Sequence, residues 1–354
     1  MQPAEGALLE PSGVDHHSSG IDNVVTNMTN STARIHAIYC NDASVIYTLI
    51  IVNSLLVSTG VFNNFLVALV VWKTKRMQNS TNLLLANNAI AEVFYLIASG
   101  SDLIMLVLFQ TNVFNVSHVV NIIKMRGPLS MLIIAPYLVA ATSLALLSIE
   151  RYNALCNPMK IQRRLGKRST KFCMLTMWLV AIILVLPVTV NLILRHGYIM
   201  DINIVIYYCV MCASLTTILG CIIVNCYGRI IYQIHISKTI FNQTCNATIS
   251  EDMKAKKNVV KMLFSITLTF CIAKLPVATF GAIMLFIEPR HINSQMHCLI
   301  FFIETLGHVS AFLNPIIYLV FNSNYRGGAL RLLKCSVHNR VARRQGSNTG
   351  SLDT

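Results

Sequence analysis

The sequence of 354 residues contains few charged residues, and acidic ones are particularly scarce. Charged residues make up 12% of the sequence, against about 25% in an ordinary soluble domain. There are 14 Asp and Glu residues and 28 Lys and Arg residues. With a mean hydropathy of +0.60, this composition excludes a soluble globular protein and a disordered chain. The sequence also lacks a nucleophile–base motif, metal-ligand spacing and a phosphate-binding glycine loop. We therefore expect no enzymatic activity, no cofactor and no bound metal.

Seven segments are long and apolar enough to cross a bilayer, which takes about 20 residues. They are Ser44–Trp72, Asn82–Phe109, Gly127–Tyr152, Phe172–Leu194, Ile202–Tyr232, Val259–Ile287 and Leu299–Phe321. The sequence therefore predicts an all-α membrane protein built as a bundle of seven transmembrane helices. We divide the chain into an N-terminal tail (1–43), the membrane domain (44–321), a membrane-surface segment (322–335) and a C-terminal tail (336–354).

The basic residues between these segments predict the orientation of the chain. With the N-terminal tail outside the cell, 22 of the 28 Lys and Arg residues lie on the inner side and five on the outer side, and Lys274 lies within a segment. Because short cytoplasmic loops carry an excess of Lys and Arg, we expect the C-terminal tail in the cytoplasm. The basic loops border the membrane, so we expect contact with lipid headgroups and no binding of nucleic acid.

Several residues outside the segments are candidates for modification. Three N-x-S/T triplets on the outer side predict glycosylation, and they are headed by Asn27, Asn30 and Asn115. Cys40 and Cys298 lie at the outer ends of the first and seventh segments, in an oxidising compartment. A disulfide between them and two free thiols are both open, because the sequence does not supply the geometry. Cys335 follows an amphipathic run on the inner side and is a predicted site of palmitoylation.

Short motifs occupy the inner ends of two segments. Glu150-Arg151-Tyr152 ends the third segment, and Asn314-Pro315-Ile316-Ile317-Tyr318 ends the seventh. Asn64, Trp178 and Pro276 lie in the first, fourth and sixth segments. In this order the motifs resemble the rhodopsin-like (class A) G-protein-coupled receptors, over roughly residues 44–335. The resemblance implies a plasma-membrane receptor that binds a ligand outside the cell and activates heterotrimeric G proteins by outward movement of the sixth helix. It also implies a short amphipathic eighth helix.

The resemblance implies a set of residues for activation and G-protein coupling. Arg151 would be held by Glu150 or released, and Pro315 would kink its helix because it lacks an N–H. Leu155 and Met159 would form the apolar floor for a helix of the G protein. The set comprises Glu150, Arg151, Tyr152, Leu155, Met159, Tyr227, Lys256, Asn314, Pro315 and Tyr318. Ser and Thr residues in the C-terminal tail are candidates for phosphorylation and recruitment of arrestin.

The sequence departs from the family pattern in the middle of the bundle. The polar core is predicted to comprise Asn64, Glu92, Lys274 and Ser310. Glu92 replaces the usual sodium-binding Asp, and Lys274 replaces an aromatic residue. Three interpretations of Lys274 are open. It supplies the positive charge that the sodium ion supplies elsewhere, it is neutral because burial lowers the pKa of a lysine, or it meets an acidic group of the ligand. Lys256 stands where an acidic partner of Arg151 is common, which predicts signalling without agonist.

The resemblance also narrows the ligand class. Ile133 replaces the Asp of amine receptors, and His308 replaces the retinal-binding Lys of opsins, so an amine and retinal are disfavoured and a peptide is preferred. The candidate ligand-contacting residues are Ile133, Pro136, Tyr137, Glu304 and His308. Two alternatives stay open: a weakly signalling or scavenging seven-helix receptor and, less favoured, a transporter that uses buried charges such as Glu92 and Lys274.

Overall fold

The structure is a computed structural model that describes residues 43–110, 116–157, 164–194, 202–241, 258–273, 276 and 294–332. Its long helices are α2 (Ala43–Lys73), α3 (Ser80–Gln110), α4 (Val116–Cys156), α5 (Lys167–Leu194), α6 (Ile202–Phe241) and α8 (Ser294–Phe321). Each of these six is long and apolar enough to cross a membrane, and a shorter apolar helix covers Asn258–Ala273. Residues 323–332 form one more helix. The predicted all-α bundle of seven helices with an eighth helix is therefore confirmed.

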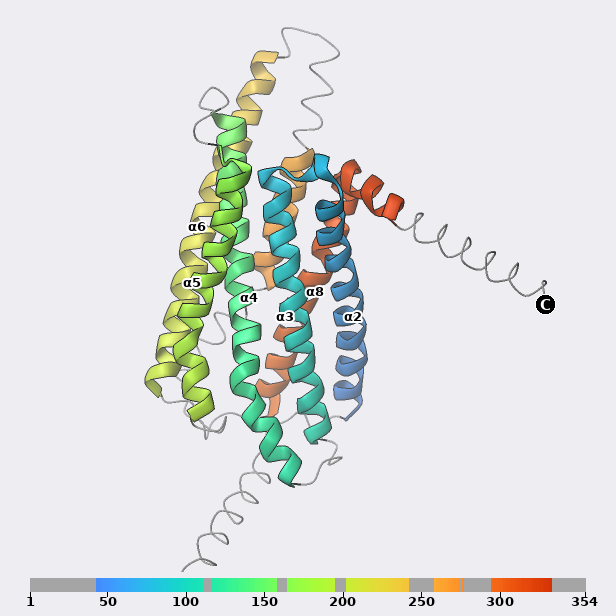
Figure 1. Cartoon of the computed structure of the whole chain (residues 1–354), viewed down its shortest axis with the longest axis vertical. Helices are drawn as coiled ribbons and strands as arrows, with labels where there is room; N and C mark the ends of the chain where they lie inside the picture. The colour runs from blue at the N-terminus through green and yellow to red at the C-terminus, as the bar shows by residue number, and fades with distance from the viewer. Residues whose placement is uncertain are drawn as a thin grey trace, which may run out of the picture.

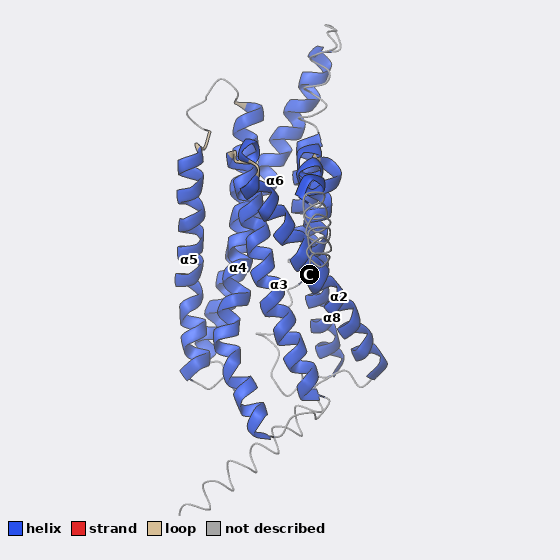
Figure 2. Cartoon of the chain, turned by 45° about the vertical axis from the view of Figure 1, so that its right-hand side comes forward, coloured by secondary structure: helices blue, strands red, loops and turns tan. Residues whose placement is uncertain are grey.

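The long helices lie side by side along one common direction (Figure 1). Within the described residues α4 packs against α3, α5 and α6, and α2 packs against α3 and α8. Figure 2, turned by 45°, shows α5 on the opposite side of the bundle from α2 and α8. We call the end of the bundle where α2 and α4 finish and α3 begins the Arg151 end. The helix of residues 323–332 branches away from the bundle at this end (Figure 1).

Polar side chains fix the connections at the Arg151 end. Asn79 caps α3, because its Oδ1 accepts a hydrogen bond of 2.9 Å from the backbone N–H of Asn82. Gln78, in the same connection, accepts a bond of 2.8 Å from the Nζ of Lys167 at the start of α5. The turn between α2 and α3 is thereby tied to the start of α5.

The helix of residues 323–332 begins at an asparagine and packs closely against α2. Asn322 caps it, because its Oδ1 accepts a bond of 3.0 Å from the N–H of Asn324. A Cβ atom on Gly328 would lie 2.6 Å from Cγ1 of Val70, so only glycine allows this approach of the helix to α2. Tyr325 and Ala329 are buried on the same side of the helix. The glycine that lowers helix propensity here therefore serves the packing.

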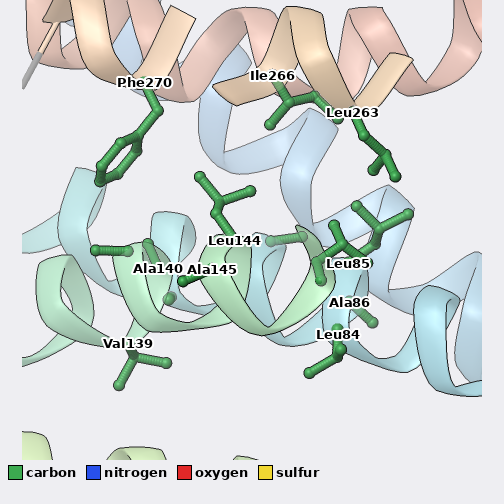
Figure 3. Close-up of a cluster of buried hydrophobic side chains, with 14 of the residues drawn as sticks. Leu84, Leu85, Ala86, Val139, Ala140, Leu144, Ala145, Leu263, Ile266 and Phe270 are labelled. Atoms are coloured by element: carbon green, nitrogen blue, oxygen red, sulfur yellow. The ribbon is translucent and has the colours of Figure 1, made fainter. Parts of the chain in front are cut away.

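The apolar core lies between α3, α4 and the helix Asn258–Ala273. Figure 3 shows Leu263 and Ile266 pointing from that helix toward Leu144 of α4 and Leu85 of α3. The outer faces of the helices are apolar as well, and Phe172, for example, is exposed to 70% of its full area. A protein surface of this kind is stable in contact with lipid, which agrees with a membrane bundle.

Candidate functional site

Pro315 and Asn64 form one polar link between α8 and α2. Pro315 has no backbone N–H, so the carbonyl of Ala311, four residues earlier, loses its usual helical donor. The Nδ2 of Asn64 donates to that carbonyl at 2.9 Å and to the carbonyl of Gly60, within α2, at 2.9 Å. Asn64 is fully buried. The side chain of one helix therefore replaces the hydrogen bond that proline removes from another.

Two further contacts join α3 to α8 beside this link. Asn314 donates from Nδ2 to Oε1 of Glu92 at 3.3 Å, and Asn88 donates from Nδ2 to the hydroxyl of Tyr318 at 3.3 Å. All four residues are buried. An ionisable residue buried in a membrane bundle is costly unless it has partners, and the amide of Asn314 is one such partner of Glu92. The predicted residues Asn64, Glu92, Asn314, Pro315 and Tyr318 thus come together in one region.

This region contains buried polar atoms with no hydrogen-bond partner in the described part of the chain. They include Oδ1 of Asn64, Asn88 and Asn314, Oγ of Ser310, Nε of Arg151 and the hydroxyl of Tyr325. A buried polar atom left unpaired costs about 1–3 kcal/mol. Such atoms in a native structure call for an explanation, and a second arrangement of the same groups is one.

Arg151 lies in α4 near its end, half-buried, with an acidic neighbour that is bound elsewhere. Oε2 of Glu150 accepts a hydrogen bond of 3.1 Å from the backbone N–H of Leu165, in the chain leading into α5. Within the described residues, Glu150, Arg164, Tyr227 and Tyr325 lie close enough to Arg151 to act on it electrostatically. The side chains that act on the guanidinium therefore come from α4, from α6, from the helix of residues 323–332 and from the chain leading into α5.

The two tyrosines that act on this arginine, Tyr227 and Tyr325, each belong to a pair of aromatic rings. Tyr227 of α6 meets Phe264 edge-on, with ring centroids 5.9 Å apart. This separation lies within the range of about 4.5–7 Å that is typical of aromatic pairs. Tyr318 of α8 lies against Tyr325, with centroids 5.8 Å apart and planes inclined by 32°. Tyr152 and Leu155 are partly buried against the same core. The structure therefore brings the predicted residues Tyr152, Leu155 and Tyr227 into the neighbourhood of Arg151.

A second polar cluster lies farther from the Arg151 end, between the same three helices. His308 of α8 is 1% exposed; its Nδ1 lies 2.5 Å from Oδ1 of Asn53 in α2, and its Nε2 lies 2.6 Å from Oγ of Ser99 in α3. Nδ2 of Asn53 donates to Oγ1 of Thr305 at 2.9 Å and to the Leu49 carbonyl at 2.7 Å. We call Asn53, Ser99, Thr305 and His308 the His308 cluster. Since Asn53 offers its oxygen, Nδ1 of His308 is the donor there.

The predicted ligand-contacting residues fall in two places. Ile133 packs against the cluster of Tyr95, Leu96 and Ala311, and the ring of Tyr95 lies 5.9 Å from that of His308. Tyr137 faces α6 instead: its hydroxyl lies 3.0 Å from Oγ1 of Thr216, and its ring stacks on Phe270 at 6.0 Å. Pro136 is buried and Glu304 half-buried. Contact of these residues with a ligand stays a prediction.

Two of the cavities that the described residues form lie on the sides of the bundle rather than between these residues. One, of about 380 Å³, lies between α4, α5 and α6 and is lined by residues such as Leu138, Met177 and Leu215. The other, of about 620 Å³, lies between α2, α3 and α5 and includes Trp72 and Lys171. None of the five predicted ligand-contacting residues lines either of them.

Several predicted residues lie outside the described part of the chain. They are Asn27, Asn30, Cys40, Asn115, Met159, Lys256, Lys274 and Cys335. Cys298 falls within α8, but its side chain is also outside the described residues. The predicted glycosylation, disulfide and palmitoylation therefore stay predictions, as do the three interpretations of Lys274.

Sequence reasoning missed several buried residues with polar groups. Asn53 could have been found as an amide within an apolar segment, where a polar group needs a partner. Asn87 offers the same signal: its Nδ2 donates to Ser143 of α4 at 2.9 Å, and its Oδ1 accepts from Nε1 of Trp178 in α5 at 3.0 Å. The position of Tyr325 carried no signal, because it depends on how its helix packs.

The structure thus combines a seven-helix bundle, buried polar links between the helices and an arginine near one end. The sequence model of the 7 transmembrane receptor (rhodopsin family) matches residues 63–318. The chain belongs to this family, and it is a receptor rather than an enzyme.

Curated relatives extend the similarity over most of the chain. A QRFP-like peptide receptor of Branchiostoma floridae is 22% identical over 309 residues, which cover 81% of this chain and 77% of the relative. The thyrotropin-releasing hormone receptor of Mus musculus is 22% identical over 359 residues, covering 89% and 85%. Opsin-VA of Rutilus rutilus is 26% identical over 243 residues, covering 61% and 60%.

Proposed function

We propose that the chain is a plasma-membrane receptor that binds an extracellular peptide and activates heterotrimeric G proteins. The similarity to a QRFP-like peptide receptor and to a thyrotropin-releasing hormone receptor supports a peptide ligand. The positions of Ile133 and His308 disfavour an amine and retinal, despite the similarity to an opsin. The Lys and Arg excess in the loops at the Arg151 end supports a cytoplasmic location for that end.

The observation that carries this proposal is the chain of polar contacts through α2, α3 and α8. It comprises the bond from Asn64 to the Ala311 carbonyl and the bond from Asn314 to Glu92. It also includes the bond from Asn88 to Tyr318, whose ring lies against that of Tyr325. Proline in α8 leaves that helix dependent on a side chain of its neighbour. A ligand that shifts α8 relative to α2 therefore changes contacts close to Arg151.

In this proposal the unpaired polar atoms make the Arg151 end bistable. A ligand can only shift an equilibrium by its different affinity for two states, so the protein must have two arrangements of similar free energy. Outward movement of the helix Asn258–Ala273 would expose Leu155 and the core around Tyr227. A helix of the G protein would then bind the apolar floor of that opening.

The test is nucleotide exchange by a panel of G-protein families in membranes that contain the receptor, without ligand and with a library of peptides. We expect exchange above background with at least one G-protein family and a further rise with a peptide. Arg151→Ala, at equal surface level, should remove most of that exchange. Surface-delivered receptor that activates no G protein with or without peptides would contradict the proposal.

A further inference from the structure

Tyr325 and Arg151 are two buried polar groups on different helices that each have an unpaired atom. Tyr325 is 1% exposed, and its hydroxyl has no hydrogen-bond partner within the described residues. Nε of Arg151 is also buried without a partner there. The two side chains are close enough to influence each other electrostatically. Each group carries a cost that the other could remove.

The chemistry of the two groups is complementary. A guanidinium has five N–H donors and no acceptor, whereas a phenolic oxygen accepts hydrogen bonds. Burial raises the pKa of Tyr325 well above its usual value, so its hydroxyl is neutral at physiological pH. An N–H of Arg151 can therefore donate to the oxygen of Tyr325, and hydrogen bonds to charged groups are the stronger kind.

Of the two side chains, Tyr325 is the one held in place. Its ring lies 5.8 Å from that of Tyr318, and its helix approaches α2 so closely that a Cβ on Gly328 would meet Val70 at 2.6 Å. Arg151 has a long side chain with rotatable bonds, and Glu150 is bound by the backbone of Leu165. A small movement of α4 or a new rotamer of Arg151 is the change that would join the two.

We propose that Tyr325 is a positioning residue for Arg151, whose guanidinium donates a hydrogen bond to the Tyr325 hydroxyl in the state that activates the G protein. This proposal rests on the proposed function and names a residue that serves the same site. In the arrangement of the structure, which the proposal takes as the resting one, the hydroxyl is unpaired and destabilises that arrangement. Tyr325 therefore raises the population of the activating state in two ways, by a cost at rest and by a bond after the change.

The proposal predicts that removing the hydroxyl oxygen of Tyr325 stabilises the ligand-free receptor but lowers its nucleotide-exchange activity. Tyr325→Phe should raise the apparent unfolding temperature of the ligand-free receptor, because an unpaired buried hydroxyl is lost. The same variant should lower agonist-free nucleotide exchange by about tenfold, because a hydrogen bond to a charged group is lost from the activating state. A residue that only stabilised the fold would change the unfolding temperature without lowering exchange.

Two matched variants control the experiment. Tyr318→Phe also removes one hydroxyl, but that hydroxyl accepts from Asn88, so this variant should lower the unfolding temperature. Ser323→Ala removes an exposed hydroxyl at the start of the same helix as Tyr325 and should change neither measurement. All variants are compared in the full chain at equal surface level.

A second measurement separates this proposal from the proposed function. A fluorophore on an Asn258→Cys substitution, at an exposed residue of the helix Asn258–Ala273, reports opening of the bundle without any G protein. Tyr325→Phe should lower the fraction of opened receptor. An equal opened fraction in the Tyr325→Phe and parent chains, or a lower unfolding temperature of Tyr325→Phe, would overturn the proposal. Normal opening of the parent chain without nucleotide exchange would contradict only the proposed function.

Discussion

The helices α2, α3 and α8 are joined by polar side chains in two regions of the bundle. One region contains Asn53, Ser99 and His308. The other lies nearer the Arg151 end and contains Asn64, Asn88 and Asn314. Each side-chain nitrogen and oxygen of Asn53 has a partner, and His308 uses both ring nitrogens. By contrast, each of the three asparagines nearer the Arg151 end has an unpaired oxygen in the described part of the chain.

The comparison teaches where this bundle is rigid and where it can change. Paired buried polar groups stabilise one arrangement strongly, because any other arrangement exposes them to an apolar interior. Unpaired buried groups raise the free energy of the arrangement that contains them, so a second arrangement can come close to it in free energy. We infer that the His308 cluster holds α2, α3 and α8 together while the Arg151 end moves.

The largest effect is expected from breaking the fully paired cluster. Asn53→Leu removes an amide that bonds both Thr305 and His308, and should cost about 2–4 kcal/mol of stability because both partners stay buried. Thermal unfolding of the purified receptor in detergent measures it. Ser54→Leu, at the exposed neighbouring position of α2, is the control and should change stability by less than about 0.5 kcal/mol.

A smaller effect should follow from breaking the link at Pro315. Asn64→Leu leaves the Ala311 carbonyl without its donor and should cost about 1–3 kcal/mol. In a Pro315→Ala background, residue 315 gains an N–H that can bond the same carbonyl, so Asn64→Leu should cost less. A double-mutant cycle of unfolding free energies measures this coupling. Equal costs of Asn64→Leu in both backgrounds would show that the link does not depend on proline.

The two adjacent glycines of the helix 323–332 sharpen the comparison at the Arg151 end. Gly328→Ala places a Cβ 2.6 Å from Val70 and should destabilise the receptor by about 1–3 kcal/mol, because a β-branched side chain in a packed core cannot yield easily. Gly327→Ala meets no atom within 4 Å and should stabilise the helix by up to about 1 kcal/mol. Equal unfolding temperatures of the two variants would contradict the close packing of this helix on α2.

Much of the fold follows from the sequence, because length and hydropathy suffice to place helices in a bilayer. The predicted segment Ser44–Trp72 corresponds to α2 (Ala43–Lys73) within a residue at each end. The segment Gly127–Tyr152 underestimates α4 (Val116–Cys156), because a helix can continue past the membrane through Lys124 and Arg126 without apolar residues.

The site is less predictable, because its properties depend on pairing rather than on residue type. Asn64 and Asn314 are recognisable as polar residues in apolar helices, but which of their atoms have partners depends on the packing of α2 against α8. Tyr325 is a further example, since its burial follows from the approach of Gly328 to Val70. A sequence pattern shows neither the packing of α2 against α8 nor the approach of Gly328 to Val70.

The contrast between the His308 cluster and the polar residues nearer the Arg151 end is tested most directly by replacing one serine in each region with alanine. Oγ of Ser99 is paired with His308 at 2.6 Å, whereas Oγ of Ser310 is buried with no partner in the described part of the chain. Ser99→Ala should lower the apparent unfolding temperature of the ligand-free receptor, and Ser310→Ala should raise it, each by the equivalent of about 1 kcal/mol. Two shifts of the same sign would contradict the view that one cluster is satisfied and the other is poised to change.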